Sequence, residues 1–473
     1  MSSASLPVEL IQRTSAAIFP PLSFLGSTNC ERTEVMSVES FDVVVVGGGP
    51  AGSIAATSLA DRGRSVLVLE SESFPRYHIG ESFVTGFVPI LEEVGITQAD
   101  MDARFQKKLG ISLIWGHDPG PWRTPFGLAS RYTHSWHVDR AQFDLLLLDN
   151  ARSHGAVVRE QAKVMSVLET DGVVTGLRYR TDGAEQIVSA SVVLDCSGQA
   201  RVVTRGRAEV EFHEDLRNVA IWGYGDFRPY SDESENDILI ESMNDGGWLW
   251  TIPLAADRAS VGHVLPAATL RQLTRDGTRS VADVFHAAIE RSTVTKHAVP
   301  PRAGFDDAQL RTARDWSHTS DRFHGPGWMA AGDAAAFVDP LFSSGVFLAG
   351  SAGWLAAKSI DASLMPGNTA AVPFAAYERI YRQLVDDILG YVRYFYDPHR
   401  KREDYMQRAR AQGEYLTRTS EIGFITLIAG VNRLPDILNF EPMGMERISE
   451  TMAKAQQSIL ESDAAVAKRL QAS

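Results

Sequence analysis

The stretch from Asp42 to Glu70 constrains the fold more than any other part of the chain. It contains an apolar run, the glycine turn GGGPAG, a helical segment and a second apolar run that ends in an acid. Each glycine has a separate role: Gly47 permits a tight turn, Gly49 lets the backbone approach a pyrophosphate, and Gly52 lets the helix pack against the strand. The pattern predicts a strand, a helix and a strand that bind a dinucleotide.

The residues around this turn complete the predicted nucleotide site. Pro50 and Ala51 begin the helix whose N-terminal amides and dipole would hold the diphosphate. Glu70 ends the second strand, where its carboxylate can accept both hydroxyls of an adenosine ribose and would repel a 2′-phosphate. We expect Ser71 and Arg76, on the loop that follows, to contact the cofactor as well. A glycine-rich turn in another kind of α/β protein is the alternative, but the whole context favours the nucleotide.

The composition excludes several classes of protein. The net charge of −13 argues against nonspecific binding to nucleic acid or to anionic membranes. Cys30 and Cys196 are the only cysteines, so no disulfide framework or cysteine-rich metal site is available, and we expect no metal. The longest uncharged apolar run near the C-terminus, Ile422 to Val431, is too short to span a bilayer. These features fit a protein of the reducing cytoplasm.

Residues 1–35 differ from the rest of the chain. They mix Pro, Ser and Thr with one short apolar patch that prolines interrupt. We expect either a disordered leader or an over-called start, so the true start is Met1 or Met36. A signal peptide is the competing interpretation, but the broken apolar core and the lack of an A-x-A-like site argue against it.

The remaining chain is long enough for two or three domains. Its elements predict an α/β fold: a Rossmann-type nucleotide-binding module over residues 36–370, with an interleaved mixed-sheet substrate domain at about 76–135 and 205–305. Residues 371–473 are predicted to form a C-terminal helical region.

A second candidate for the nucleotide site lies between residues 328 and 357. An apolar run leads into the turn Gly332-Asp333, where the carboxylate is well placed to accept a sugar hydroxyl. A small-residue helix is predicted to begin near Ser344. The amides around Ser344 and Gly345 would form a second helix N-terminus, which is again a site for an anion.

Three other features are ambiguous when each is taken alone. Lys107 and Lys108 precede a strand-like run, and solvent exposure is the simpler interpretation of either. Arg140, one turn into a predicted helix, could reach a phosphate or a ring edge, or could cap its own helix surface. Trp248 and Trp250 are two residues apart, so they share one face of a predicted strand, where packing against a second layer is favoured over the wall of a pocket.

The two separated stretches, 42–70 and 328–357, must meet around one nucleotide. Their interleaving, with the D-x-SG-like turn DCSG between them, resembles the FAD module of the aromatic-hydroxylase type. The resemblance covers nearly everything from about residue 40 to 400. It implies that the dinucleotide is FAD, which spacing alone does not distinguish from NAD.

Within that superfamily, four stretches resemble the flavin-dependent halogenases. DPLFSSG is similar to the family's flavin and halide loop, and FPRYHIGES, residues 74–82, to the strap that links flavin and substrate sites. Lys108 stands where the family carries its essential lysine, with Lys107 as the second choice. GWLWTIP matches the W-x-W-x-I-P signature, formed here by Trp248, Trp250, Ile252 and Pro253.

The resemblance also implies a mechanism. Reduced FAD, supplied by a separate flavin reductase, gives a flavin hydroperoxide with oxygen. Chloride held by the amides of Ser344 and Gly345 attacks it, and hypochlorous acid is guided to Lys108. There the amine hydrogen-bonds the acid or forms a chloramine beside an aromatic substrate, and burial would favour the neutral amine that the second route requires.

One departure from the family narrows the predicted substrate. Phe342 stands where tryptophan-specific members carry a glutamate that helps the ring intermediate. Phenols and pyrroles need this help less, so we expect a phenolic or pyrrolic compound of secondary metabolism, free or bound to an acyl or peptidyl carrier protein. The alternatives are an FAD-dependent aromatic monooxygenase, a geranylgeranyl-reductase-like enzyme and a non-enzymatic flavoprotein. The position halogenated, chloride versus bromide, and the oligomeric state stay open.

Overall fold

The computed structural model describes residues 38–116, 121–128, 131–231, 236–244, 246–300, 302, 304–397, 399–412 and 420–442. The chain divides into two units, Met1–Val38 and Glu39–Ser473, and the fold below belongs to the second. The predicted leader, residues 1–35, lies outside the described residues, as do Cys30 and the part of the predicted helical region after residue 442.

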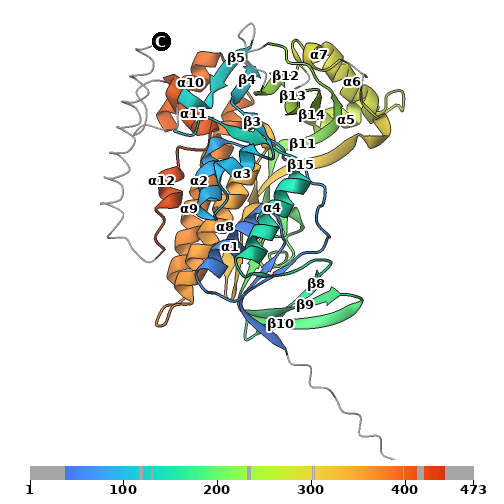
Figure 1. Ribbon diagram of the computed structural model, residues 1–473. Coiled ribbons are helices and arrows are strands. Elements are labelled where there is room, and N and C mark those ends of the chain that lie inside the picture. Colours follow the sequence, from blue (N-terminus) through green and yellow to red (C-terminus); the bar gives the residue numbers. More distant parts are fainter. Residues whose placement is uncertain are drawn as a thin grey trace, which may run out of the picture. The chain divides into compact units, whose positions relative to one another are not determined.

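The first sheet contains five neighbouring parallel strands, as the apolar runs of the sequence predict. Its central strands β1 and β10 are buried toward their C-terminal ends, with valines 43, 44 and 45 of β1 at 0% exposure. Two strands, β8 and β9, extend it as an antiparallel arm (Figure 1). In spatial order the path is β16 (His324–Gly325), β17 (Trp328–Ala330), β10 (Ala184–Asp195), β1 (Glu39–Val46), β2 (Val66–Leu69) and β7 (Val157–Arg159), with β8 (Lys163–Thr170) and β9 (Val173–Thr181) on β10.

The register of these strands decides where the loops meet. Val46 at the end of β1 lies opposite Leu69 of β2 and Asp195 of β10, and Asp195 lies opposite Ala330 of β17. Because the strands are parallel, the four loops that follow them leave from the same edge of the sheet. Ligands of open α/β sheets bind at this edge.

Helices cover the sheet and pack on one another. Helices α1 and α8 approach so closely that a Cβ atom on Gly353 would lie 2.2 Å from the carbonyl oxygen of Ala51. Figure 1 shows α1 and α8 side by side. Helix α9, which follows α8 in the sequence, packs against α8. The helices are α1 (Pro50–Asp61), α4 (Arg140–Ser153), α8 (Gly345–Ser363) and α9 (Ala371–Phe395).

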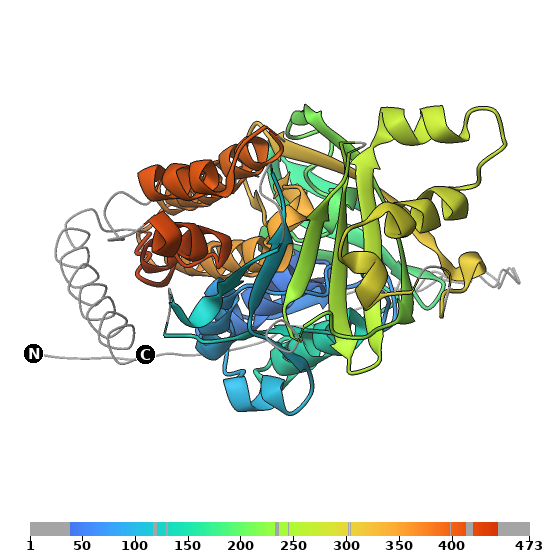
Figure 2. The same cartoon turned by 90° about the horizontal axis from the view of Figure 1, so that it is seen from above.

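The second sheet carries the aromatic strands of the predicted substrate domain. Helices α5 (Ala267–Thr274), α6 (Val281–Arg291) and α7 (Thr295–Ala298) lie beside it in Figure 2, and they share with it a separate hydrophobic cluster. In spatial order its strands are β18 (Ala336–Phe337), β15 (Arg311–Ser320), β11 (Val210–Asp226), β14 (Arg258–Pro266), β13 (Trp248–Ala255), β12 (Ile238–Ser242), β4 (Gly110–Ile114) and β5 (Trp122–Pro125). A two-stranded sheet pairs β3 (Gln106–Lys108) with β6 (Ser135–His137).

These observations confirm the predicted α/β fold class, with one local difference. The apolar spacing of residues 83–105 predicts one helix, but the chain forms a 3₁₀ turn (Thr85–Phe87) and two short helices, α2 (Val88–Glu93) and α3 (Gln98–Asp102). Gly95 adopts φ +83° between the two helices, and Thr97 then caps α3 through a reciprocal hydrogen-bonded box with Asp100. The turn at Gly95 and the helix cap at Thr97 therefore interrupt the helix that the spacing of apolar residues predicts.

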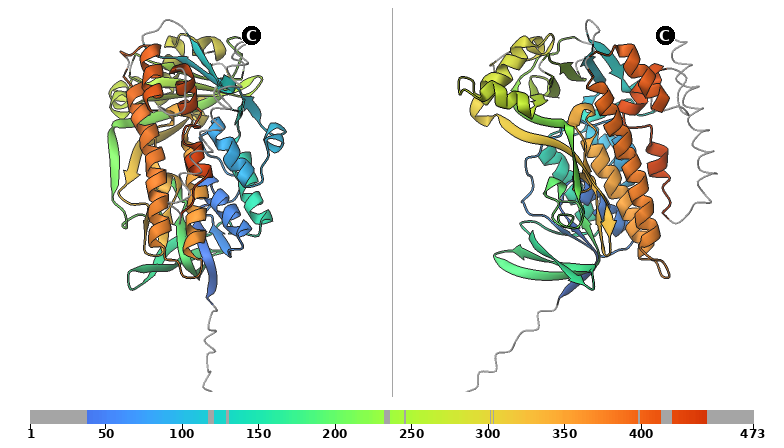
Figure 3. Two further views of the ribbon diagram at one scale, coloured as in Figure 1. Left: turned by 90° about the vertical axis from the view of Figure 1, so that its left-hand side faces the viewer. Right: turned by 180° about the vertical axis from the view of Figure 1, so that it is seen from behind.

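The described part of the C-terminal region is helical, as predicted. Figure 3 shows the long helix α9 alongside α8 from two further sides. It is followed by α10 (Arg402–Gln412), α11 (Ser420–Ile428) and α12 (Leu434–Leu438). Among the described residues, no helix is long and apolar enough to cross a membrane, and no group of three or more His, Cys, Asp or Glu side chains is arranged to hold a metal ion.

Gly353→Ala tests the close contact between α1 and α8. Replacing glycine by alanine inside a helix normally stabilises a protein by about 0.5–1 kcal/mol. Here we expect a loss of about 2 kcal/mol or more, because the new methyl group overlaps the backbone of α1. Urea unfolding measures the difference, and Gly127→Ala, whose Cβ would have no neighbour closer than 3.6 Å, is the control. A stabilised Gly353→Ala variant would contradict the packing described here.

Candidate active site

The glycine turn after β1 has the predicted geometry. Gly47 adopts φ +103°, and a Cβ there would lie 2.4 Å from the carbonyl oxygen of Cys196. A Cβ on Gly52 would lie 2.0 Å from the carbonyl oxygen of Gly47. By contrast, among the described residues, a Cβ on Gly49 would have one heavy atom within 4 Å, Nη2 of Arg76 at 3.4 Å. The backbone is thus packed on one side, and on the other it is open beside a guanidinium group, as a phosphate site requires.

The acid at the end of β2 is held beside this turn. Glu70 is 5% exposed, and its carboxylate accepts N–H groups from Gly48 at 2.7 Å and from Glu72 at 2.8 Å. The hydroxyl of Ser71 donates to the same carboxylate at 3.3 Å. Backbone donors therefore fix the orientation of the group that we expect to bind ribose.

The two predicted arginines share one buried carboxylate that the sequence analysis missed. Arg140 donates to both oxygens of Asp144, at 2.8 and 3.0 Å, and Nη1 of Arg76 lies 3.4 Å from the same group. Arg140 also donates to the carbonyl oxygens of Ile79 and Gly80 in the strap, at 2.6 and 3.3 Å. Arg140 therefore positions the strap. The i,i+4 spacing of Arg140 and Asp144 is the signal that could have revealed this pair.

The strap is anchored a second time through its glutamate. Glu81 is 4% exposed, and its carboxylate accepts a hydrogen bond from the hydroxyl of Tyr224 at 2.7 Å. Its backbone carbonyl accepts from the amide of Val138 at 2.8 Å. Burial raises the pKa of Glu81. Tyr224 belongs to β11 of the second sheet, and Val138 follows β6 of the two-stranded sheet. The strap is thus held against these two sheets.

The two other turns at this edge also match their predicted places. Asp195 is fully buried, and one of its oxygens accepts N–H groups from Val203 and Thr204, at 2.8 and 2.7 Å, which closes the DCSG turn. Gly332 follows β17 with φ +64°, where a Cβ would lie 3.2 Å from that of Ala51. Asp333 keeps part of its surface exposed, and desolvation raises the pKa of its carboxyl group to about 6.

The loop between Asp339 and Gly345 has features of an anion site. Asp339 caps the turn by accepting the amide of Leu341 at 3.1 Å, and Ser343 adopts the left-handed conformation, with φ +57°. The backbone then enters α8 at Gly345, where a Cβ would have no neighbour within 4 Å. The hydroxyl of Ser344 is buried and has no hydrogen-bond partner among the described residues. The loop therefore presents free polar groups at a helix N-terminus.

A small apolar cavity adjoins this loop. Its volume is about 10 Å³, which is room for about one water-sized species. It is lined by Val84, Phe342, Ser344, Ile388, Tyr391, Leu427, Ile428 and Gly430.

Lys108 and Lys107 differ completely in their surroundings. Lys108 is 0% exposed, its Nζ has no hydrogen-bond partner among the described residues, and it lies 5.3 Å from the ring centre of Phe126. Desolvation lowers its pKa to about 7, although the negative charge of Asp237 opposes this shift. Lys107 is exposed and pairs with Asp102 at 2.7 Å. Of the two candidate lysines, Lys108 is therefore the one that is buried without a hydrogen-bond partner among the described residues.

A buried histidine and an aromatic cluster surround this lysine. Burial lowers the pKa of His137 well below its usual value, and the charge of Lys108 acts in the same direction. The 3₁₀ turn that carries Phe126 packs against α11. Ring contacts then lead from Trp122 to Phe424 (5.3 Å), from Phe424 to Phe395 (6.3 Å) and from Phe395 to Phe342 (5.0 Å). These rings therefore reach the loop at Phe342, and the 3₁₀ turn that carries Phe126 beside Lys108 packs on the helix that carries Phe424.

The signature strand lies beside this cluster. Trp248 and Trp250 are 1% and 6% exposed, with ring centres 5.9 Å apart, so both pack in the core as the simpler interpretation predicts. Their N–H groups go to different partners: Trp248 donates to the hydroxyl of Tyr396 at 2.7 Å, and Trp250 to that of Ser260 at 3.2 Å. Ile252 and Pro253 continue the same buried strand.

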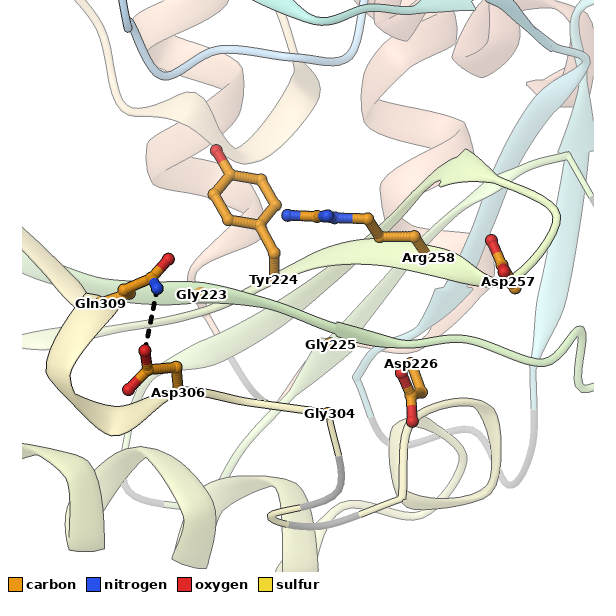
Figure 4. A pocket seen from close by; sticks show the side chains of 9 residues that line it. All are labelled: Gly223, Tyr224, Gly225, Asp226, Asp257, Arg258, Gly304, Asp306 and Gln309. Carbon is orange, nitrogen blue, oxygen red and sulfur yellow. Dashed lines mark hydrogen bonds between the residues drawn. The ribbon is translucent and has the colours of Figure 1, made fainter.

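A larger cavity of about 420 Å³ lies elsewhere, at the end of β11 beyond its pairing with β15. Figure 4 shows Tyr224 and Arg258 above the strands and the hydrogen-bonded pair Asp306 and Gln309 below them. Its lining contains no Lys108, no Ser344 and no residue of the glycine turn. We therefore do not assign the chemistry to this cavity. It is lined by Gly223, Tyr224, Gly225, Asp226, Asp257, Arg258, Gly304, Asp306 and Gln309.

The chain matches the tryptophan halogenase family over residues 42–133 and 128–422. It is 33% identical to the Tryptophan 2-halogenase of Chondromyces crocatus, over 87% of this chain and 80% of that protein. It is 32% identical to the brominase of 1H-pyrrole-2-carbonyl-peptidyl-carrier protein from Pseudoalteromonas luteoviolacea, over 72% of this chain and 81% of that protein. Among solved structures, the myxobacterial chondrochloren halogenase CndH, an FAD-dependent halogenase, superposes with a TM-score of 0.72 at 31% identity, over 90% of this chain and 97% of CndH.

Lys108→Met tests the burial of the amine. The folded-state pKa of about 7 lies below the ordinary value of 10.5, so charging Lys108 opposes folding below pH 7. We expect Lys108→Met to raise the free energy of unfolding there, on the order of 3 kcal/mol, and the gain to shrink between pH 7 and 10.5. Urea unfolding across this pH range measures it. Lys107→Met should change the free energy by less than about 0.5 kcal/mol, and equal effects of the two variants would contradict the assignment.

Proposed function

The chain belongs to the tryptophan halogenase family and is a flavin-dependent halogenase that uses FAD and a halide, and we propose that it halogenates a phenolic or pyrrolic ring through Lys108. The observation that carries this proposal is the fully buried amine of Lys108, which has no hydrogen-bond partner among the described residues. A buried lysine with a pKa near 7 supplies a neutral amine at physiological pH.

The residues around the glycine turn fit FAD. The open backbone at Gly49 with Arg76 beside it suits the pyrophosphate, and the carboxylate of Glu70 suits the adenosine ribose. Asp333 after β17 would accept a hydroxyl group of the ribityl chain of FAD. Reduced FAD bound here supplies, with oxygen, the two-electron oxidation that converts chloride to hypochlorous acid.

The loop before α8 would hold the halide. The amides of Ser344 and Gly345 stand at the positive end of a 19-residue helix, and the hydroxyl of Ser344 is buried without a partner among the described residues. Asp339 fixes the turn that leads into these amides. A chloride ion would be stabilised by these donors.

Lys108 would then direct the oxidised halogen. Its amine either donates a hydrogen bond to hypochlorous acid or takes the chlorine from it: the N–Cl bond forms, the O–Cl bond breaks, and the N–H proton leaves with hydroxide as water. The ring carbon attacks the chlorine, the N–Cl electron pair returns to nitrogen, and the proton that the ring then loses restores the amine.

The substrate class follows from Phe342. Its ring is 4% exposed and packs on Tyr391 and Phe395, with centres 5.4 and 5.0 Å away, so no carboxylate stands at this position to stabilise a charged ring. A phenol or a pyrrole supplies the electron density itself. The similar Pseudoalteromonas protein is named for a pyrrole on a carrier protein, which supports a substrate delivered in that form. A separate reductase would provide reduced FAD.

Tryptophan is the second candidate substrate, because the similar Chondromyces protein is named a tryptophan 2-halogenase. The indole C2 position resembles a pyrrole in its electron density. The two candidates differ in whether the enzyme turns over free tryptophan efficiently.

A substrate panel separates these candidates. Purified protein, a generic flavin reductase, FAD, NADH and chloride are incubated with free tryptophan and with free and carrier-bound phenols and pyrroles. We expect a mass gain with the chlorine isotope pattern for a phenol or pyrrole, at a rate at least about tenfold above tryptophan. Efficient chlorination of free tryptophan would contradict the proposed substrate class, and a gain of one oxygen independent of chloride would indicate a hydroxylase.

Lys108→Ala tests the role of the amine directly. We expect chlorinated product to fall by at least about 10³-fold, with free hypochlorous acid released in its place and with the dissociation constant of FAD unchanged within about twofold. Lys107→Ala is the matched control, since its exposed side chain pairs with Asp102, and it should keep product formation within about twofold. Product formation by Lys108→Ala at the parent rate would remove this residue from the mechanism.

A further inference from the structure

The first signature tryptophan is connected to the halide loop by hydrogen bonds. The indole of Trp248 on β13 donates to the hydroxyl of Tyr396, at the end of α9, at 2.7 Å. That hydroxyl donates in turn to Oδ2 of Asp339 at 2.8 Å. Asp339 directly precedes the turn that leads to Ser344 and Gly345. A strand, a helix end and a loop that are far apart in sequence therefore meet at one phenol.

A fourth side chain closes this network. The amide group of Asn218 on β11 donates to Oδ2 of Asp339 at 3.1 Å and to the hydroxyl of Tyr396 at 3.2 Å. The other oxygen of Asp339 accepts the amide of Leu341 at 3.1 Å. The carboxylate thus accepts three donors while 0% of its residue surface is exposed. Buried polar groups that are fully paired in this way hold one arrangement rigidly.

We propose that Trp248, Tyr396 and Asp339 form a positioning relay that fixes the amides of Ser344 and Gly345 for the halide. The carboxylate of Asp339 sets the turn, the hydroxyl of Tyr396 holds the carboxylate, and the indole N–H of Trp248 orients the hydroxyl. None of the three touches the reacting atoms. The inference rests on the proposed halide site at this loop.

The relay gives the two signature tryptophans different roles. Trp250 is packed beside Trp248, but its N–H donates to Ser260 on the neighbouring strand β14, away from the loop. A requirement for packing alone would be met by any large apolar side chain at either position. The relay requires, at position 248, a side chain that is buried and also carries a hydrogen-bond donor.

Halide affinity of the FAD-bound protein tests the relay. The dissociation constants of chloride and bromide are measured from the change in absorbance and fluorescence of bound oxidised FAD, and the KM for chloride from product formation. We expect Tyr396→Phe to weaken halide binding by about tenfold and to leave the dissociation constant of FAD within about twofold. Trp248→Phe should weaken halide binding in the same direction.

The control is Tyr394→Phe. Tyr394 lies two residues before Tyr396 on α9, and its hydroxyl donates to the carbonyl of Asp404 at 3.3 Å, so the same atom is removed without touching the loop. We expect this variant to bind halide as the parent does. The double variant Trp248→Phe/Tyr396→Phe should bind halide no more weakly than Tyr396→Phe alone, because the indole acts through the phenol.

The outcomes separate the relay from the function it serves. Unchanged halide affinity in Tyr396→Phe, an equal loss in Tyr394→Phe, or additive losses in the double variant would each overturn the relay. A parent protein whose FAD signal and product formation do not respond to chloride or bromide would instead overturn the proposed halide site.

Discussion

The parallel register of four strands is the constraint on which the candidate site depends. The ends of β1, β2, β10 and β17 lie at one level, so Gly47, Glu70, the DCSG turn and Gly332 leave the sheet together. That register is possible only because the backbone after β1 folds back on itself within contact distance of Cys196. The nucleotide end of the site is therefore a product of backbone packing, with few side chains involved.

Much of this end could be predicted from the sequence, because its determinants are local. The glycine turn and the acid that ends β2 depend on neighbours within a few residues, and Gly47 adopts the positive φ that the tight turn requires. Lys108 is different. Nothing in its immediate sequence predicts a buried amine, and only the resemblance to a family singled it out from Lys107.

The interactions that the sequence analysis missed are long-range or depend on burial. Asp144 holds Arg76 and Arg140 together, and Asp339 collects donors from β11 and α9. Periodicity shows which residues are buried, but not which polar group meets which. The sequence also does not show which ionisable groups lose their contact with water. Burial lowers the pKa of Lys108 to about 7 despite the charge of Asp237.

The position of Tyr396 in the chain also has a consequence for assembly. The glycine turn lies near the beginning of the described residues, whereas the phenol that meets Trp248 and Asp339 follows the long helix α9. During synthesis the growing chain would therefore complete its nucleotide turn long before the loop at Ser344 acquires its final support. Under the halide role proposed for this loop, a partly made chain would therefore lack the ordered site at which the halide is held.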